Sequence, residues 1–267
     1  MHTIHLKHPN KSRPVELTVP GSWNELSNKQ LIQAAKVLGA ALPRDEMRMR
    51  LLMVLVNVPW YSLRAYWWWF QLDGDALPDL LSLTDFLFES NDLTDWKIKW
   101  IKPFKAPTLY GPFNRLSNIT LHEFSYADTA FNDYLGTEDQ HQLNKLIAVL
   151  YRPGVDHSAN DPREPFDQYK LEKRARKIAR LSWPVRLAIL YNWIGCRSMI
   201  TDMFPKIFSQ KDGKASKFGW ADVIVSTAGQ KFGTVDQTAD ANLFNILIHH
   251  KQQIEEQEEL QKQQKKK

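Results

Sequence analysis

The sequence TLHEFSYADTAFNDYLGTEDQHQLNKLIAVLYR, residues 120–152, contains two successive patterns that are typical of helices. Each half opens with the spacing of a capping box, in which a Ser or Thr is followed three positions later by Glu or Gln. The two pairs are Thr120 with Glu123, and Thr137 with Gln140. Gly136 stands between the halves and can end the first helix. We therefore predict two helices joined by one glycine and one cap, which is a helical hairpin.

The chain before this hairpin has a short extended start and then becomes helical. Apolar and polar residues alternate within the first 20 residues, and the sequence HPNKSRP between the two alternating runs supplies a turn. This pattern predicts a small β-hairpin. Ser27 with Gln30 forms another capping box, and the helix that it opens can end at Gly39.

Residues 96–101 predict one further short strand, because Trp96, Ile98 and Trp100 alternate with lysines. Prolines follow and favour an irregular linker, so we place a soft boundary there. The apolar stripe of the last helix ends after Ile254, and a polar, frayed tail is expected beyond. The predicted fold class is mainly α, a multi-helix globular body with the N-terminal β-hairpin. Its predicted parts are an N-terminal hairpin plus helical domain (1–106), a helical domain (107–250) and the tail (251–267).

Composition indicates a globular protein and limits the classes of function. Hydrophobic residues make up 43% of the 267 residues and charged residues 24%, an ordinary globular balance. The net charge of +5 falls to +1 without the four lysines among the last six residues, so the body is nearly neutral. The longest apolar segment, 51–63, is too short and too broken to span a bilayer, and the start of the chain lacks a signal-peptide core. A soluble protein is expected.

Candidate catalytic and metal-binding residues do not form a recognisable constellation. His122 and Glu123 resemble the start of a zinc-protease helix, but position 126 is Tyr where that motif needs a second histidine. Cys196, the single cysteine, lies in an apolar run and is expected to be a small buried residue. The glycines form neither a P-loop nor a dinucleotide fingerprint. We predict no enzymatic activity, no cofactor and no metal.

Five consecutive aromatic residues, 66–70, form the most unusual segment of the chain. Successive side chains on a helix lie about 100° apart, so five of them surround the helix axis. One interpretation is a helix buried on every side in the core. The other is a helix with one side in the core and the other against a partner protein, where Trp is a favoured anchor. The candidate partner-binding residues here are Trp67, Trp68 and Trp69.

The predicted helix DQYKLEKRARKIARL, residues 167–181, carries a basic face. Its candidate binding residues, spaced on one side of the helix, are Lys173, Arg176, Lys177 and Arg180. Such a stripe can follow a phosphate backbone, contact a protein partner or belong to an ordinary solvated surface.

Three stretches carry a family resemblance. They are the opening strand leading into PGSWNELSNKQL, the central hairpin with the later LAILYNWIGCRSMITDMFPKIF, and the C-terminal GWADVIVSTAGQKFGTVDQTADANLFNILIHH. Together they resemble proteins encoded in the tail-gene modules of phages and prophages, near the tail assembly chaperone and the tape measure. The match follows apolar and capping positions in order over most of the chain. The resemblance implies a non-enzymatic helical protein that acts in virion assembly or is built into the tail.

We therefore expect a tail assembly or structural protein that acts through protein–protein contacts, with other phage tail or assembly proteins as partners. The expected location is the host cytoplasm or the virion. The alternative is a helical nucleic-acid-binding protein that uses the basic helix over 170–180. The sequence leaves the partner and the oligomeric state open.

Overall fold

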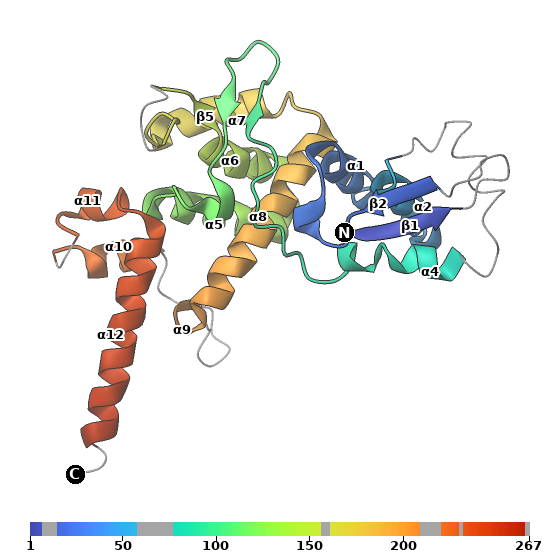
Figure 1. Ribbon diagram of the computed structural model, residues 1–267. Coiled ribbons are helices and arrows are strands. Elements are labelled where there is room, and N and C mark those ends of the chain that lie inside the picture. Colours follow the sequence, from blue (N-terminus) through green and yellow to red (C-terminus); the bar gives the residue numbers. More distant parts are fainter. Residues whose placement is uncertain (7–14, 58–76, 156–160, 209–219, 230–231, 265–267) are drawn as a thin grey trace. The chain divides into compact units, whose positions relative to one another are not determined.

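The computed structural model describes residues 1–6, 15–57, 77–155, 161–208, 220–229 and 232–264 (Figure 1). The described chain is mainly helical, as predicted. It divides into two compact units, which are described separately here. Unit 1 comprises Met1–Lys97 and Ser182–Cys196, and unit 2 comprises Ile98–Leu181 and Arg197–Lys267. The division into domains at 1–106, 107–250 and 251–267 stays a prediction.

Unit 1 begins with the predicted hairpin, in which β1 and β2 pair antiparallel with His2 opposite Val19. The capping box of Ser27 and Gln30 is complete in both directions, and α1 ends at the C-cap Gly39 as expected. The elements of unit 1 before residue 98 are β1 (His2–Leu6), β2 (Val15–Val19), α1 (Asn28–Leu38), α2 (Arg44–Leu55) and α4 (Leu77–Ser82).

Helix α8 (Trp183–Met203) begins in unit 1 and continues into unit 2. In unit 1 it packs against the segment around Leu93. The buried side chain of Asn192 accepts a hydrogen bond from Lys97 N at 2.8 Å and donates one to Asp95 O at 3.1 Å. Cys196 is fully buried beside it, as expected for a small core residue.

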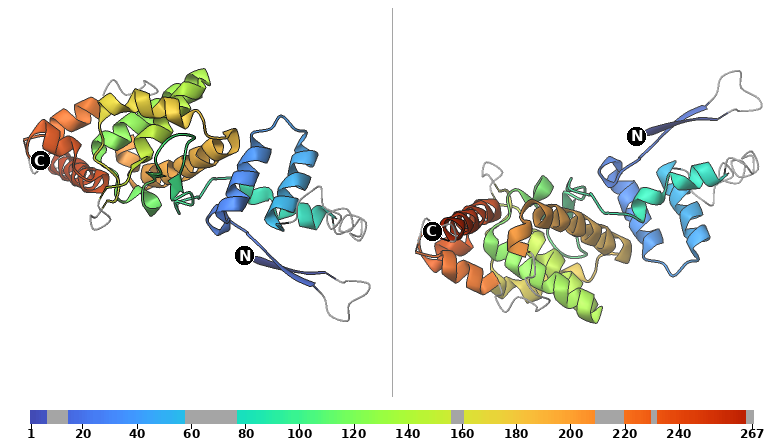
Figure 2. Two further views of the ribbon diagram at one scale, coloured as in Figure 1. Left: turned by 90° about the horizontal axis from the view of Figure 1, so that it is seen from above. Right: turned by 90° about the horizontal axis from the view of Figure 1, so that it is seen from below.

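Unit 2 is built around the predicted helical hairpin of α5 and α6. Helix α6 packs against both α5 and α7 (Figures 1 and 2). A three-stranded antiparallel sheet, ordered β3-β4-β5, belongs to the same unit, and the sequence predicted only its first strand. The elements are β3 (Trp100–Ile101), β4 (Leu109–Tyr110), α5 (Leu121–Thr137), α6 (Gln140–Leu150), β5 (Arg152–Pro153), α7 (Leu171–Ile178), α9 (Pro205–Phe208), α10 (Trp220–Thr227), α11 (Val235–Ala239) and α12 (Leu243–Gln264).

The structure confirms the two predicted central capping boxes only in part. Thr120 caps α5 by accepting a hydrogen bond from Glu123 N at 3.2 Å, but the Glu123 carboxylate binds Arg152 instead of returning to the cap. Helix α5 continues past Gly136 and ends at Thr137, and its C-cap Glu138 has a left-handed φ of 55°. Asp139 caps α6 by accepting from His141 N at 2.8 Å, so the predicted pair of Thr137 and Gln140 is wrong.

The alternation predicted over 96–101 holds only in part. Trp96 and Ile98 are buried, but Trp100 is 60% exposed and Ile101 is buried instead. Only Trp100–Ile101 form a strand, because Lys97 N donates to the Asn192 side chain and Ile98 O accepts from the Tyr151 hydroxyl instead of joining a strand ladder.

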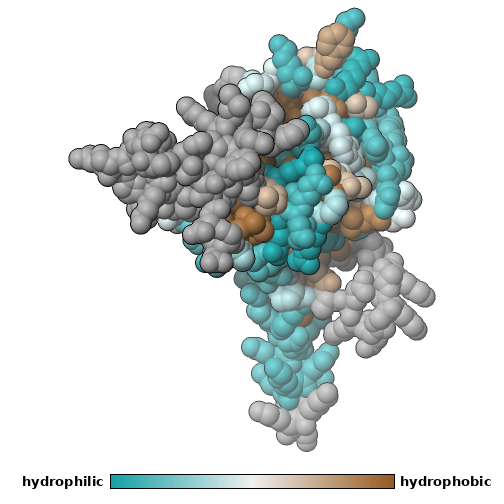
Figure 3. All heavy atoms as spheres, turned by 90° about the vertical axis from the view of Figure 1, so that its right-hand side faces the viewer, coloured by the Kyte–Doolittle hydropathy of each residue, from teal (hydrophilic) through white to brown (hydrophobic). Residues whose placement is uncertain are grey.

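The polar C-terminal segment is helical instead of frayed. Helix α12 continues through Gln264, and beyond Ile254 its side chains are largely exposed. Figure 3 shows this end of α12 as mostly hydrophilic. Gln, Glu, Lys and Leu are all good helix formers, so the helix persists after its apolar stripe has ended.

Candidate interaction surface

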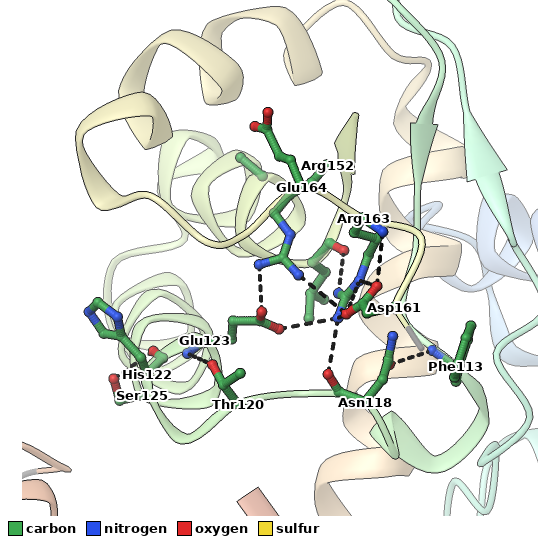
Figure 4. Close-up of polar contacts among 12 residues, drawn as sticks. Phe113, Asn118, Thr120, His122, Glu123, Ser125, Arg152, Asp161, Arg163 and Glu164 are labelled. Atoms are coloured by element: carbon green, nitrogen blue, oxygen red, sulfur yellow. Dashed lines mark hydrogen bonds and ion pairs between the residues drawn. The ribbon is translucent and has the colours of Figure 1, made fainter. Parts of the chain in front are cut away.

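A buried network of charges holds β5 and the segment that follows it against α5 (Figure 4). Arg152 Nη1 lies 2.5 Å from Glu123 Oε1, and Arg163 Nη2 lies 3.3 Å from Glu123 Oε2. Arg163 also binds Asp161, with Nη2 2.7 Å from Oδ2. Two cations and two anions compensate one another, so the network can be buried without a net charge.

The pKa values within this network follow from burial and pairing. Burial lowers the pKa of Arg152, and the charge of Glu123 opposes that fall. Burial alone would raise the pKa of Asp161, but hydrogen bonds from Arg163 and its charge outweigh burial and lower it. The four side chains hold one another in place, and this arrangement fits a structural role.

A second buried pair orients α7. Arg174 Nη2 lies 2.6 Å from Glu164 Oε1, and Arg174 Nη1 donates to Ala148 O of α6 at 2.9 Å. Burial lowers the pKa of Arg174, while the neighbouring Glu164 carboxylate opposes that change. With Arg174 turned inward, the opposite face of α7 turns outward.

The outward face carries the residues that the sequence singled out. Lys173, Arg176 and Arg180 are exposed and Lys177 is half-buried. Among the residues that the structure describes, Lys173, Arg176 and Lys177 have no ion-pair partner, and Arg180 Nη1 donates to Phe104 O at 3.2 Å. Lys170 is the N-cap of α7 and approaches Glu164 and Asp167 only at 3.9 and 3.7 Å. We call Lys170, Lys173, Arg176, Lys177 and Arg180 the basic surface.

A hollow of about 270 Å³ opens beside the basic surface. Its charged lining, three lysines and an arginine against one glutamate, carries a net positive charge. The remaining lining is apolar and comes from the loop before β4 and from the sheet itself. The lining residues are Pro107, Leu109, Pro153, Glu164, Lys170, Lys173, Arg174 and Lys177. The hollow can therefore accept a small anionic group with some apolar surface.

Exposed aromatic residues belong to the same unit and were not predicted as site residues. Phe104 is 68% exposed in the loop between β3 and β4, and Tyr169 is 89% exposed immediately before Lys170. The sequence KPFKAP, in which lysines flank a single aromatic residue, is the local signal that could have indicated Phe104. The candidate residues Trp67, Trp68 and Trp69 lie outside the described residues, so their role stays a prediction.

Comparison of the chain with protein-family models, curated proteins and solved structures found no match. Within the described ranges, no helix combines the length and apolar character needed to cross a membrane. In the same part of the chain, no group of His, Cys, Asp and Glu side chains is placed to hold a metal ion.

Proposed function

We propose that this chain is a non-enzymatic assembly or structural protein of a phage or prophage tail, acting in the host cytoplasm or the virion through protein–protein contacts. The observation that carries the proposal is the basic surface, whose Lys173, Arg176 and Lys177 have no acidic partner among the described residues. Exposed aromatic residues accompany it. Aromatic and Arg side chains are the favoured anchors of protein interfaces. The resemblance to tail-module proteins supports the choice of partner.

The contact would form in two parts. A carboxylate of the partner would enter the hollow and accept charge-assisted hydrogen bonds from Lys173 and Lys177. Apolar surface of the partner would then cover Pro107, Leu109 and Pro153, which line the same hollow. The buried pair of Arg174 and Glu164 would keep α7 fixed while the partner binds.

The geometry favours a protein partner over a nucleic acid. Helix α7 has 8 residues. At about 1.5 Å of rise per residue it extends only about 12 Å, which is short for a surface that follows a phosphate backbone. The three lysines of the basic surface also line a hollow with two prolines and a leucine, surroundings that suit a side chain of a protein.

The experiment is co-expression of the chain with the proteins encoded beside its gene, followed by size-exclusion chromatography. We expect a tape-measure, tail-tube or other tail gene among the neighbours and a complex that elutes with fixed stoichiometry. A metabolic operon around the gene, or separate elution from every tail protein tested, would overturn the proposal.

A second candidate function is nucleic-acid binding, favoured by the cations at helical spacing on α7 that have no ion-pair partner among the described residues. Each phosphate contact would make the affinity fall as the salt concentration rises. On duplex DNA the logarithm of the binding constant falls with the logarithm of the salt concentration, with a slope of about −0.9 per contact. Retention on DNA that is salt-dependent and abolished by Lys173→Glu/Arg176→Glu would support this candidate in place of the first. Equal retention of both proteins, or of neither, would exclude the basic surface as a nucleic-acid site.

A further inference from the structure

A second hollow of unit 2, of about 440 Å³, differs from the first in its chemistry. Its apolar lining comes from the segment before α7 and from α10 and α11, and Val225 and Val235 are 63% and 47% exposed. We call it the α10–α11 groove. Its lining residues are His122, Phe166, Gln168, Ile224, Val225, Val235, Asp236, Ala239 and Asp240.

The charged groups at this groove are acidic. Asp236 and Asp240 stand four positions apart on α11 and its C-cap, and so share one side of that helix. Neither carboxylate has an ion-pair partner within the described part of the chain. His122 forms one wall, where its ring packs edge-on against Phe166 with centroids 5.0 Å apart. The groove therefore suits an apolar group that is flanked by cations.

The loop between β3 and β4 presents such a group. Ala106 N donates to Pro103 O at 3.1 Å, which closes a tight turn with Phe104 and Lys105 at its tip. Lys105 has a left-handed φ of 55°, and Arg180 Nη1 donates to Phe104 O at 3.2 Å, which links the turn to the segment after α7. Lys102 and Lys105 are exposed on either side of Phe104. We call Lys102, Phe104 and Lys105 the aromatic knob.

We propose that the aromatic knob of one copy of this chain docks into the α10–α11 groove of a second copy. An apolar cavity of about 150 Å³ is enough to hold a benzene ring, so the groove has room for the Phe104 ring and the methylene groups of its lysines. The two lysine charges of the knob match the two carboxylates at the groove.

The contact needs a second copy because the two parts lie at different ends of unit 2. The β3–β4 loop lies at the top of Figure 1, whereas α10 and α11 lie beside the first turn of α12. A contact between two different surfaces gives a ring if successive rotations from copy to copy return to the first copy. Otherwise it gives an open chain of copies that can keep growing. This inference does not rest on the tail-module proposal, because both surfaces belong to this chain.

The test is sedimentation velocity on the purified full chain over a wide range of concentration. We expect the wild-type chain to associate as its concentration rises. Phe104→Ala, which removes the knob, and Asp236→Lys/Asp240→Lys, which reverses the groove, should each weaken that association about tenfold or more. Leu260→Ala removes an exposed apolar side chain of α12 that belongs to neither the knob nor the groove, and it should leave the association unchanged.

Mixing identifies the contact. Phe104→Ala keeps a working groove and the Asp236→Lys/Asp240→Lys chain keeps a working knob, so the mixture should form a complex that neither variant forms alone. Circular dichroism of each variant checks that it is folded. Three outcomes would each overturn the proposal. The wild-type chain could stay monomeric at every concentration, the variants could associate as the wild type does, or the mixture of variants could fail to recover association. None of these outcomes bears on the tail-protein partner, because the samples contain only this chain.

Discussion

At the scale of single residues, two helical glycines have opposite roles. A Cβ atom at Gly195 would lie 2.4 Å from Leu93 O and 2.7 Å from Leu93 N, whereas a Cβ at Gly136 would meet nothing within 4 Å. Gly195→Ala should therefore destabilise the protein by about 1–3 kcal/mol through overpacking. Gly136→Ala should stabilise it by roughly 0.5–1 kcal/mol, because glycine weakens a helix. Denaturant unfolding of both variants measures the difference.

The Gly136 variant also distinguishes two accounts of the hairpin. The sequence predicts that Gly136 ends α5, and if it did so in a left-handed conformation, alanine there would be destabilising. The structure gives the left-handed position to Glu138 instead. A loss of stability in Gly136→Ala would contradict the structure of this turn.

Asp161 should contribute to the pH dependence of stability. Its pKa is lowered in the folded protein, because the hydrogen bonds and charge of Arg163 outweigh burial. A carboxyl with a lowered pKa stabilises the fold above its unfolded pKa, and that contribution is lost as pH falls below about 4. In Asp161→Asn the free energy of unfolding should depend less on pH in this acid range. If the free energy of unfolding of Asp161→Asn depended on pH in this range as strongly as that of the wild type, Asp161 would not be paired as described.

At the scale of elements, the pair of Glu123 and Arg152 should hold α5 to β5. Replacing Arg152 with Met leaves the Glu123 carboxylate buried with a single weaker partner, and removal of one member of a buried ion pair costs about 3–5 kcal/mol. Adding Glu123→Leu to Arg152→Met removes the carboxylate that has lost this partner. Because neither Met nor Leu carries a charge, the double variant should recover part of the lost stability. Thermal unfolding of the single and double variants tests the coupling, and fully additive losses would argue against it.

The exposed end of α12 should be dispensable for folding. Beyond Ile254 its side chains are largely exposed, and its contact with α9 includes an exposed ion pair of Lys206 and Glu258 at 2.7 Å. Such pairs contribute little to stability. A chain that stops after Ile254 should unfold at the same temperature as the full chain. A marked fall in that temperature would mean that this end is packed against the body.

Local patterns predicted the helices better than their contacts. The pairing of Ser27 with Gln30 lies within one helical turn and was read correctly. The partner of Glu123 lies 29 positions away, so no local rule could assign that carboxylate to Arg152. The exposed face of α7 followed from helical spacing, but the inward turn of Arg174 depends on Glu164 and Ala148. The hollow beside α7 needs residues from four separate stretches of the chain and could not be predicted.

At the scale of the whole molecule, opposite charges mark the two regions of unit 2 that are proposed to make contacts. The basic surface has unpaired lysines, and the α10–α11 groove has unpaired aspartates within the described ranges. Contacts of this kind weaken with ionic strength, since the Debye length shortens from about 10 Å at 0.1 M salt to about 3 Å at 1 M. Both the proposed partner contact and the proposed self-association should therefore weaken in high salt.

The basic surface is proposed to bind a protein of the tail module. The most direct measurement is calorimetric titration of the chain with the tail protein encoded beside its gene, using the wild type and Lys173→Glu/Lys177→Glu. Lys29→Glu/Lys36→Glu, at two exposed lysines of α1, makes the same change in net charge elsewhere. We predict an affinity about tenfold or more weaker for the first variant and unchanged for the control. Equal affinities for all three proteins would contradict the claim.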